Sequence, residues 1–426
     1  MIPLASWLLL VFILFPRNEG AASNEIAAPR TVETARNQFV TERQKEITRV
    51  LRLPVDRTTE PAWIETFWAM GLLRFTPKEA EKEFARVWHS FPDRSHSFQR
   101  SALECAHTLF PKTTSFSEPI QRIATRTSHP KIFAMAALYL GQSNPNLQEE
   151  WRSRIPTRFP NWENDPILTS LHHHLTAVRP AIPEVKDLLH HDWGDRAVIF
   201  SLQRRDRRYP GRLLIRRPDG RFHRTADGAL FSMPLLALAQ SNLPGFLTNG
   251  NTPSGIFAVL GTGHSRNAFI GPTESLILAL PHEHPPHTFF HHAGRNSQWK
   301  KEDYHQLLPP SWQNHFPIWE AWRAGQAGRF EIIAHGTTIN PKFYEKELCY
   351  PLTPSLGCLT TLEFWSAETG QRTRSDQQRL VDAWKAINPD RGFAVVADID
   401  SEKAPVSLAE IEALLKKPGE PHSPGD

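Results

Sequence analysis

Residues 330–361 read FEIIAHGTTINPKFYEKELCYPLTPSLGCLTT, and the rest of the chain is interpreted around this stretch. A short apolar run, 332–334, leads into a His-Gly pair, His335 and Gly336. A polar loop follows, and then a Ser-x-Gly-Cys turn that ends at Cys358. A histidine and a cysteine, each beside a glycine at an expected strand end, are the ingredients of a base-activated thiol nucleophile. We therefore predict an active site in this stretch.

The residue types in this stretch suit nucleophilic catalysis. A free thiol with a pKa of about 8.5 is mostly protonated at neutral pH, so Cys358 needs a base. His335 can take the thiol proton and later return it to a leaving amine. Backbone N–H groups at Gly357 and Cys358 can form an oxyanion hole, and Gly357 leaves room for a substrate backbone. Ser355 can hold the turn through its hydroxyl, and Gly336 permits close packing of the two segments. Either a backbone carbonyl or Ser355 can orient the His335 ring.

The chain has three cysteines, which is few for an exported protein, and their odd number leaves at least one thiol unpaired. Cys105 lies on the apolar face of an expected helix, so we expect it to be buried as a small hydrophobic residue. Cys349 and Cys358 are close in the sequence and could form a disulfide. That disulfide would remove the nucleophile, so it competes with the prediction of a reactive Cys358.

Residues 1–23 differ in composition from the rest of the chain. Residues 7–15 are uninterrupted apolar sequence, and 20–23 supply the small residues of a cleavage site. The apolar run is too short to cross a bilayer comfortably, so the pattern predicts a secretory signal peptide. An uncleaved N-terminal anchor is the alternative. We therefore expect export to the periplasm or cell envelope.

The overall composition is that of a folded protein with two or three domains. Of its 426 residues, 22% are charged and 40% are hydrophobic. The net charge of +4 suits an anionic polymer or surface as a partner. The densest basic run, 204–208, is short and contains an aspartate, so we expect no nucleic-acid partner.

Residues 24–185 show apolar side chains at helical spacing, which predicts an all-α region. Its expected helices begin near Pro61, His96, Pro130 and Pro166, about 35 residues apart, and this is a helix-pair period. The period favours stacked hairpins of a short α-solenoid, with an irregular helical domain as the alternative. The region carries no catalytic constellation, so we expect it to serve as a targeting module or to bind a protein partner.

The pattern changes to short strands beyond residue 190. Residues 196–202 and 212–215 read as strands, and 251–259 (NTPSGIFAV) leads into another. We therefore predict a mainly β catalytic domain over 190–402, which makes the whole chain an α+β multidomain protein. Residues 403–426 are expected to form a C-terminal helix and a disordered tail.

Three motifs occur in a characteristic order: Thr-Pro-x-Gly-x-Phe-x-Val at 252–259, His-Gly at 335–336 and Ser-x-Gly-Cys at 355–358. This ordered set resembles the L,D-transpeptidase (YkuD-like) catalytic domain. That domain ends with a helix and a closing strand, and residues 375–387 and 392–399 fit these two places. The resemblance covers about half of the chain.

The resemblance implies that Cys358 attacks the amide after a diaminoacyl residue in a peptidoglycan stem peptide and forms a thioester. An amine acceptor then completes transpeptidation in cell-wall biogenesis, whereas water gives carboxypeptidase or endopeptidase activity. A non-catalytic cell-wall-binding protein is a further alternative. We expect Thr337 and Thr360 to contact the substrate, and we expect no cofactor.

The chain departs from the family pattern at three places. Leu356 stands where the family has histidine or arginine, and Thr360 stands where it has an arginine. The loss of this arginine removes a fixed cation beside the thiol, which could lower the thiol pKa or bind a carboxylate. The spacing from His335 to Cys358 is also long, with 344–350 as the expected insertion.

A larger insertion is expected over 265–328. Its histidines between 282 and 292 raise the alternative of a metal site in a metal-dependent hydrolase. Their spacing matches no metal-binding pattern, so we predict a Pro-rich surface loop and no metal ligands. The tryptophans of 318–322 (IWEAW), which show helical spacing, are expected to be core residues, with an active-site lid or a glycan-stacking surface as the alternative.

Overall fold

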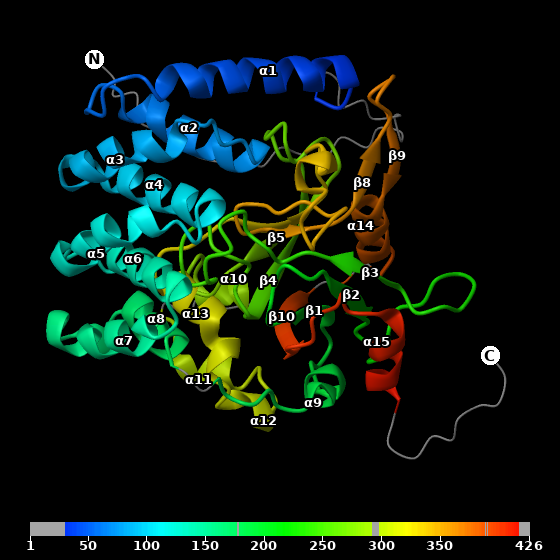
Figure 1. Cartoon of the computed structure of the whole chain (residues 1–426). Coiled ribbons are helices and arrows are strands. Elements are labelled where there is room, and N and C mark those ends of the chain that lie inside the picture. Colours follow the sequence, from blue (N-terminus) through cyan, green and yellow to red (C-terminus); the bar gives the residue numbers. More distant parts are fainter. Residues whose placement is uncertain (1–29, 177–178, 292–297, 388, 390, 417–426) are drawn as a thin grey trace.

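The computed structural model describes residues 30–176, 179–291, 298–387, 389 and 391–416 (Figure 1). The predicted signal peptide and most of the predicted C-terminal tail lie outside these residues. Among the described helices, none combines the length and the apolar character needed to cross a membrane. The described chain consists of a helical N-terminal region followed by a mixed β-sheet region, which agrees with an α+β fold.

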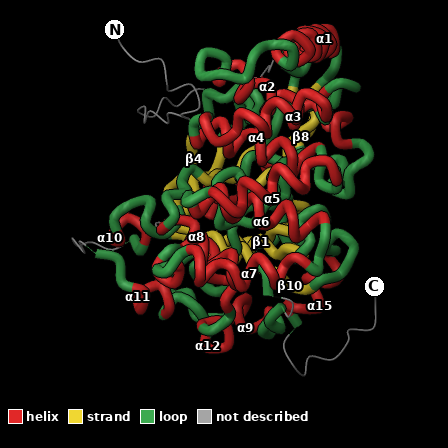
Figure 2. Tube along the Cα trace, turned by 60° about the vertical axis from the view of Figure 1, so that its left-hand side comes forward, coloured by secondary structure: helices red, strands yellow, loops and turns green. Residues whose placement is uncertain are grey.

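The N-terminal region is a stack of helices. Its even-numbered members pack in sequence, α2 on α4, α4 on α6 and α6 on α8. Figure 2 shows these helices stacked from top to bottom in front of the strands. The predicted starts near residues 61, 96, 130 and 166 agree within one residue with α2, α4, α6 and α8. The helices are α1 (Glu33–Val50), α2 (Glu60–Leu73), α3 (Ala80–Ser90), α4 (His96–Leu109), α5 (Ser117–Arg126), α6 (Pro130–Ser143), α7 (Leu147–Arg158) and α8 (Pro166–His174).

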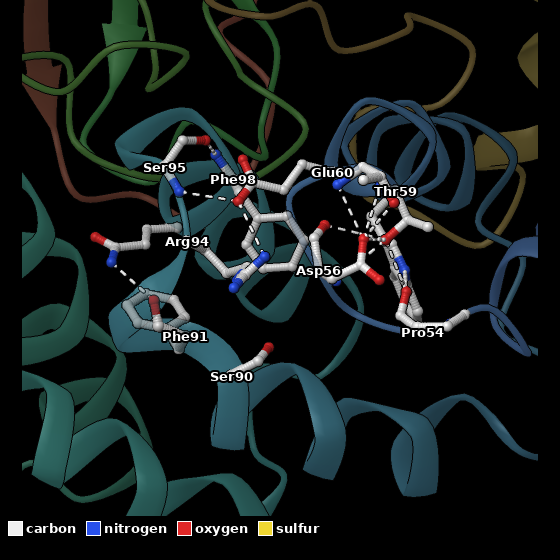
Figure 3. Close-up of polar contacts among 12 residues, drawn as sticks. Pro54, Asp56, Thr59, Glu60, Ser90, Phe91, Arg94, Ser95 and Phe98 are labelled. Carbon is white, nitrogen blue, oxygen red and sulfur yellow. Dashed lines mark hydrogen bonds and ion pairs between the residues drawn. The ribbon is translucent and has the colours of Figure 1, made fainter.

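A buried polar cluster fastens the start of α2 to the start of α4 (Figure 3). Glu60 forms an ion pair of 3.5 Å with Arg94 and accepts a hydrogen bond of 3.2 Å from the Ser95 N–H. The Ser95 hydroxyl in turn accepts from the Phe98 N–H and caps α4. Because Glu60 and Arg94 are about nine-tenths buried, their pairing holds the two helix starts together.

The core of the helical region is aromatic and extends into the second half of the chain. Phe67, Phe84 and Phe98 pack ring against ring at about 5.5 Å. Cys105 is 2% exposed in this core, which confirms its predicted burial. Leu243, Phe246 and Leu247, from the loop after β3, belong to the same core. The helical region is therefore packed onto the β region through apolar side chains.

Eight strands of the second half form one curved sheet in the order β3-β2-β1-β10-β4-β5-β6-β7. The pairs β1–β10 and β6–β7 are parallel, and the others are antiparallel. Just after β3, Leu236 exchanges two backbone hydrogen bonds of 2.9 Å with Thr360 of β7. This exchange joins the two edges, so the sheet is a nearly closed barrel. The strands are β1 (Ala197–Arg204), β2 (Gly211–Arg216), β3 (Ser232–Leu235), β4 (Gly255–Gly263), β5 (Ser275–Ala279), β6 (Ile332–His335), β7 (Leu359–Thr360) and β10 (Gly392–Asp400).

The remaining elements surround this sheet. A two-stranded hairpin, β8 with β9, lies beside it. The predicted closing helix and strand are α14 and β10, and the final helix α15 begins with a Ser407–Glu410 capping box. These elements are α9 (Val185–His190), α10 (Pro286–Phe289), α11 (Lys301–His305), α12 (Pro310–Gln313), α13 (Glu320–Gln326), β8 (Glu363–Trp365), β9 (Arg372–Ser375), α14 (Asp376–Ile387) and α15 (Leu408–Leu415).

The segment 265–328 is only partly an insertion. It contains β5, which pairs with β4 on one side and β6 on the other, so this part completes the sheet. Trp312, Trp319 and Trp322 are at most 6% exposed and pack in the core beside β4 and β10. The burial of Trp319 and Trp322 confirms the core prediction, and all three rings are excluded as an exposed glycan platform.

Helix α1 reaches across to the β region (Figure 1). The Glu33 N–H donates to the Ala367 carbonyl at 2.8 Å, and the Thr31 hydroxyl donates to the Gly370 carbonyl at 3.1 Å. Arg36 donates to the Thr338 carbonyl at 3.3 Å, three residues after His335. The first helix therefore lies against the loop that follows the predicted catalytic histidine.

Candidate functional site

The sheet register brings the segments of the predicted cysteine and histidine together. His335 ends β6 and pairs with Thr360 of β7, two residues after Cys358. Opposite residues of paired strands project to the same side, so His335 and Thr360 share a face of the sheet. Ala334 and Leu359 pair in the same way and project into the core of the sheet. Cys358 lies in the bend that leads directly into β7.

The thiol of Cys358 is free and half-buried. Its Sγ donates to the Glu331 carbonyl oxygen at 3.7 Å. Burial raises the pKa of Cys358 to about 11, although the Ile333 backbone and the Arg329 charge act in the opposite direction. Among the described residues, no hydrogen bond joins this sulfur to the His335 ring. The structure therefore brings the two residues to neighbouring segments without a hydrogen bond between their side chains in the described part of the chain.

The predicted disulfide between Cys349 and Cys358 is absent from this structure, in which all three cysteines are free. Cys349 is 1% exposed and packs in a small apolar cluster with Leu238 and Leu352. The thiol of Cys358 projects instead toward the backbone of Glu331. The competing prediction of a disulfide is therefore wrong for this structure, and Cys358 keeps its thiol.

The ring of His335 is 5% exposed and is oriented by its own neighbour. Its Nδ1 lies 2.5 Å from the Gly336 carbonyl oxygen, which accepts the Nδ1 proton and leaves Nε2 as the proton acceptor. The backbone-carbonyl alternative is therefore the one that the structure supports, and Ser355 bonds elsewhere. Burial lowers the pKa of His335 to about 4, so the imidazole is neutral at neutral pH.

The hydroxyl of Ser355 holds the cysteine turn, as predicted. It donates to the Cys358 carbonyl at 2.8 Å and accepts from the Gly357 N–H at 2.9 Å. Because the Gly357 N–H is used in this way, its predicted place in an oxyanion hole is wrong for this structure. The prediction of an oxyanion hole then depends on the Cys358 N–H.

Gly357 makes room for an arginine rather than for a substrate. Its φ is +121°, and a Cβ at this position would lie 2.0 Å from Arg329 Nη2 and 2.6 Å from the Gly250 carbonyl oxygen. The Thr252 hydroxyl donates to the Gly357 carbonyl at 2.9 Å. The Thr-Pro-x-Gly segment and the cysteine turn are therefore in direct contact, although they lie more than 100 residues apart.

Arg329 is a functional candidate that the sequence did not reveal. It is 5% exposed, and its guanidinium donates to the carbonyls of Gly250 at 2.7 Å and Asn251 at 2.8 Å. Further carbonyl acceptors are those of Gly245, Leu247 and Gly357. Burial lowers the pKa of Arg329 to about 10, so it remains a cation at neutral pH. It places beside the Cys358 turn the positive charge that the family pattern carries two residues after the cysteine.

Two predicted substrate contacts are buried structural residues. Thr360 is 1% exposed, and its hydroxyl donates to the Thr353 carbonyl at 2.8 Å. Thr337 is 5% exposed, and its hydroxyl donates to the Phe269 carbonyl at 3.3 Å. Both hydroxyl groups are used within the fold, so the predicted substrate contacts at Thr337 and Thr360 are wrong for this structure.

Gly336 is closely packed, but against the carboxylate of Glu363 in β8 rather than against the cysteine segment as predicted. A Cβ at Gly336 would lie 2.0 Å from Glu363 Oε2. Glu363 is 4% exposed and accepts from the hydroxyls of Thr273 and Ser375, each at 2.6 Å. Burial raises the pKa of Glu363. The Glu363 carboxylate therefore packs directly against the backbone of the His-Gly-Thr segment at Gly336.

The surroundings of the thiol are apolar on the solvent side. Phe330 is 53% exposed and precedes Glu331, whose carbonyl faces Sγ. Leu356, 38% exposed, stands in the cysteine turn itself. Large exposed apolar side chains in the two segments that meet at the thiol suit an apolar portion of an acyl donor.

Two histidines of the segment 282–292, His282 and His291, make contacts with protein groups. The His282 ring packs on Trp299 at 4.8 Å and on Trp322 at 4.3 Å, and His291 Nε2 lies 3.0 Å from the Gly392 carbonyl oxygen. His292 lies outside the described residues. In the described ranges, the group with metal-ligand spacing is Asp400, Glu402 and Glu410. Each of these carboxylates forms an ion pair with the buried guanidinium of Arg204.

No protein-family model matches this chain, and no curated protein or solved structure matches it either. The resemblance to L,D-transpeptidases therefore depends on the three motifs and their order. The activity that it implies is a proposal.

Proposed function

We propose that this protein is an exported cysteine acyl-transferase of the L,D-transpeptidase type, acting on peptidoglycan stem peptides in the periplasm or cell envelope. One observation carries the proposal: the strand that ends with His335 pairs in parallel with β7, which begins directly after Cys358. The contact between Thr252 and Gly357 supports it, because two of the three ordered motifs meet there.

The reaction follows from a neutral thiol and a neutral imidazole. As Cys358 Sγ forms a bond to the amide carbonyl carbon, His335 Nε2 takes the thiol proton and the carbonyl oxygen gains the electron pair. Collapse of the tetrahedral intermediate breaks the C–N bond, and the imidazolium returns the proton to the leaving amine. A thioester on Cys358 remains. An acceptor amine then attacks the thioester carbonyl carbon and gives a proton to His335. The C–S bond breaks, and His335 passes this proton to the sulfur, which restores the thiol.

This sequence of steps requires a change at the cysteine. In the described structure Sγ faces the Glu331 carbonyl, so the thiol must rotate toward His335 before the proton can move. The ring of His335 needs no change of tautomer, because Nδ1 is already the donor and Nε2 the acceptor. Arg329 stabilises negative charge on the sulfur as the proton leaves.

The same thiol supports a second candidate, a carboxypeptidase or endopeptidase in which water replaces the acceptor amine. A non-catalytic cell-wall-binding protein is favoured by one observation, the lack of a hydrogen bond between Sγ and the His335 ring in the described structure. The stacked even-numbered helices support the proposal of an α-solenoid-like N-terminal region, which also binds a protein partner.

A mass measurement tests the proposal. Purified protein is incubated with a carbapenem, whose strained carbonyl acylates the cysteine of L,D-transpeptidases, and its intact mass is recorded. We expect one adduct on the wild type and on Cys349→Ala, none on Cys358→Ala, and slow formation on His335→Ala. A folded wild-type protein without adduct would contradict the reactive thiol. Incubation with stem peptides and an amine acceptor then separates joined products from cut ones.

A further inference from the structure

We propose that a groove between α1 and the loop after His335 binds the C-terminal carboxylate of a peptide with an apolar last residue. The groove is lined on one side by Arg30, Arg36 and Phe39 and on the other by Phe269 and residues 338–340. The groove is partly open to solvent. The inference deepens the proposed function and rests on it for the nature of the peptide.

Within the described part of the chain, neither arginine of the groove forms an ion pair with a carboxylate, although the Glu33 charge acts on Arg36. Arg36 donates to the carbonyl of Arg30 at 3.2 Å and to that of Thr338 at 3.3 Å. Arg30 Nη1 is buried and has no hydrogen-bond partner among the described residues. By contrast, Arg43 and Arg49 of the same helix pair with Glu65 and Glu46. The groove therefore holds two guanidinium groups that an anion can satisfy.

Burial removes water from around the guanidinium groups of Arg30 and Arg36. It lowers the pKa of Arg30, and the neighbouring charge of Arg43 lowers it further. Burial also lowers the pKa of Arg36, and this outweighs the opposite effect of Glu33. A bound carboxylate would restore the lost charge stabilisation and could accept hydrogen bonds from both side chains.

The other walls of the groove are apolar. The Arg30 guanidinium lies between two rings, 4.7 Å from the Phe39 centroid and 4.3 Å from the Phe269 centroid. Ile339 and Phe343 complete the lining. This combination selects an anion joined to an apolar side chain, which a peptide ending in a small apolar residue provides.

The groove is held open by contacts that do not involve its ligand. The Glu33 N–H and the Thr31 hydroxyl donate to the β8–β9 turn, which fixes the start of α1. On the facing side, the Thr338 hydroxyl and the Thr338 N–H bond to the carbonyls of Ala268 and Phe269. Because both walls are anchored, a ligand need not order them.

The loop links this groove to the catalytic histidine. Thr338 is three residues beyond His335, and Trp365 Nε1 donates to the Thr337 carbonyl between them at 2.8 Å. A peptide whose carboxylate is held at Arg36 is therefore bound beside the loop that carries the general base. We infer that the helical region contributes to substrate selection through α1.

Calorimetric titration tests the inference. The probes are N-acetyl-D-alanyl-D-alanine, the same peptide as a C-terminal amide, and inorganic phosphate, each added to the full chain with Cys358→Ala to prevent turnover. We expect the free acid to bind at least about tenfold more tightly than the amide and more tightly than phosphate. Equal binding of acid and amide overturns the inference, and so does tighter binding of phosphate, which would indicate a site for small anions.

Variants locate the binding. In the same background, Arg36→Gln and Arg30→Gln should each weaken binding of the free acid about tenfold, whereas Arg36→Lys should retain part of it. The matched control is Arg49→Gln, which removes the same charge from the exposed far end of α1 and should leave binding unchanged. If Arg30→Gln and Arg36→Gln bind the acid as well as Arg49→Gln does, the groove is not the site. A missing carbapenem adduct would contradict the activity while leaving these titrations interpretable.

Discussion

The turn that carries Cys358 and the loop that carries His335 are held in different ways. The turn is fixed by side chains from distant segments: Ser355 within it, Thr252 from the loop before β4, and Arg329 from the loop before β6. The His335 ring is oriented by the carbonyl of the next residue. The position of the nucleophile is therefore a tertiary property, whereas the orientation of the base is a local one.

A residue with a strained backbone, Glu331, precedes the histidine strand β6 and contacts the thiol of Cys358. Glu331 has a φ of +58°, in the left-handed region that residues other than glycine rarely adopt. Its N–H donates to Glu283 Oε1 at 3.0 Å, which helps to hold this conformation, and its carbonyl faces Cys358 Sγ. Strain of this kind commonly occurs at functional sites. Here it sets the direction of the carbonyl that the thiol contacts.

The largest effect is expected from Gly357→Ala. The methyl group would meet Arg329 and the Gly250 carbonyl, in addition to the cost of a positive φ, so we expect a loss of about 3–5 kcal/mol in the free energy of unfolding. Gly261→Ala is the matched control, because its φ of +122° is nearly the same and a Cβ there meets nothing within 4 Å. It should cost about 1–2 kcal/mol. The two losses are measured by urea denaturation. Equal losses of unfolding free energy in Gly357→Ala and Gly261→Ala would show that the turn is not tightly packed.

The burial of a neutral His335 is tested by the pH dependence of the free energy of unfolding. The folded pKa of His335 is about 4 and the unfolded value about 6.5, so the unfolded state binds the extra proton first as pH falls. The contribution of His335 to stability is therefore complete above about pH 6.5 and is lost as pH falls toward 4, by about 3 kcal/mol in all. In His335→Asn, the loss of unfolding free energy between pH 7 and pH 4 should be smaller by about this amount. His89→Asn, which alters an exposed histidine of α3, controls for removal of an imidazole. An unchanged pH dependence in His335→Asn would contradict the buried neutral ring.

The smallest effect is expected from Ser355→Ala. Loss of the two hydrogen bonds to Gly357 and Cys358 should lower the free energy of unfolding by about 1–2 kcal/mol. It should also release the Gly357 N–H, so the rate of Cys358 alkylation by iodoacetamide should change together with stability. Thr353→Ser, which retains a hydroxyl nearby, is the control. Unchanged stability and an unchanged alkylation rate would show that Thr252 and Arg329 suffice to hold the turn.

The elements with a clear period were predictable. The starts of α2, α4, α6 and α8 agree with the sequence prediction because each follows from local helical spacing. The elements β1, β2, α14 and β10 also agree with it, because the pattern of their apolar residues is local too. The short run 275–279 was assigned to an insertion, although it is the strand β5 between β4 and β6. A five-residue apolar run carries too little periodicity to distinguish a sheet strand from a buried loop.

The candidate site was predicted only in part. The chemical types of Cys358, His335 and Ser355 follow from the motif, and the Ser355 hydroxyl acts as predicted. Thr337 and Thr360 were expected to meet a substrate, but both are buried. The sequence does not indicate whether a threonine hydroxyl will form a hydrogen bond within the folded protein or remain free for a substrate.

By itself, the sequence determined which side chains can perform the chemistry and where the helices begin, because nucleophilicity and periodicity are local properties. The tertiary structure decided what lies around the thiol. Arg329 became its neighbouring cation because the loops 245–251 and 355–358 converge on one guanidinium. Arg30 and Arg36 likewise became a candidate binding site because α1 is anchored to the β8–β9 turn. Segments that are distant in the sequence come together at both places through long-range contacts, and the spacing of residues along the chain does not predict such contacts.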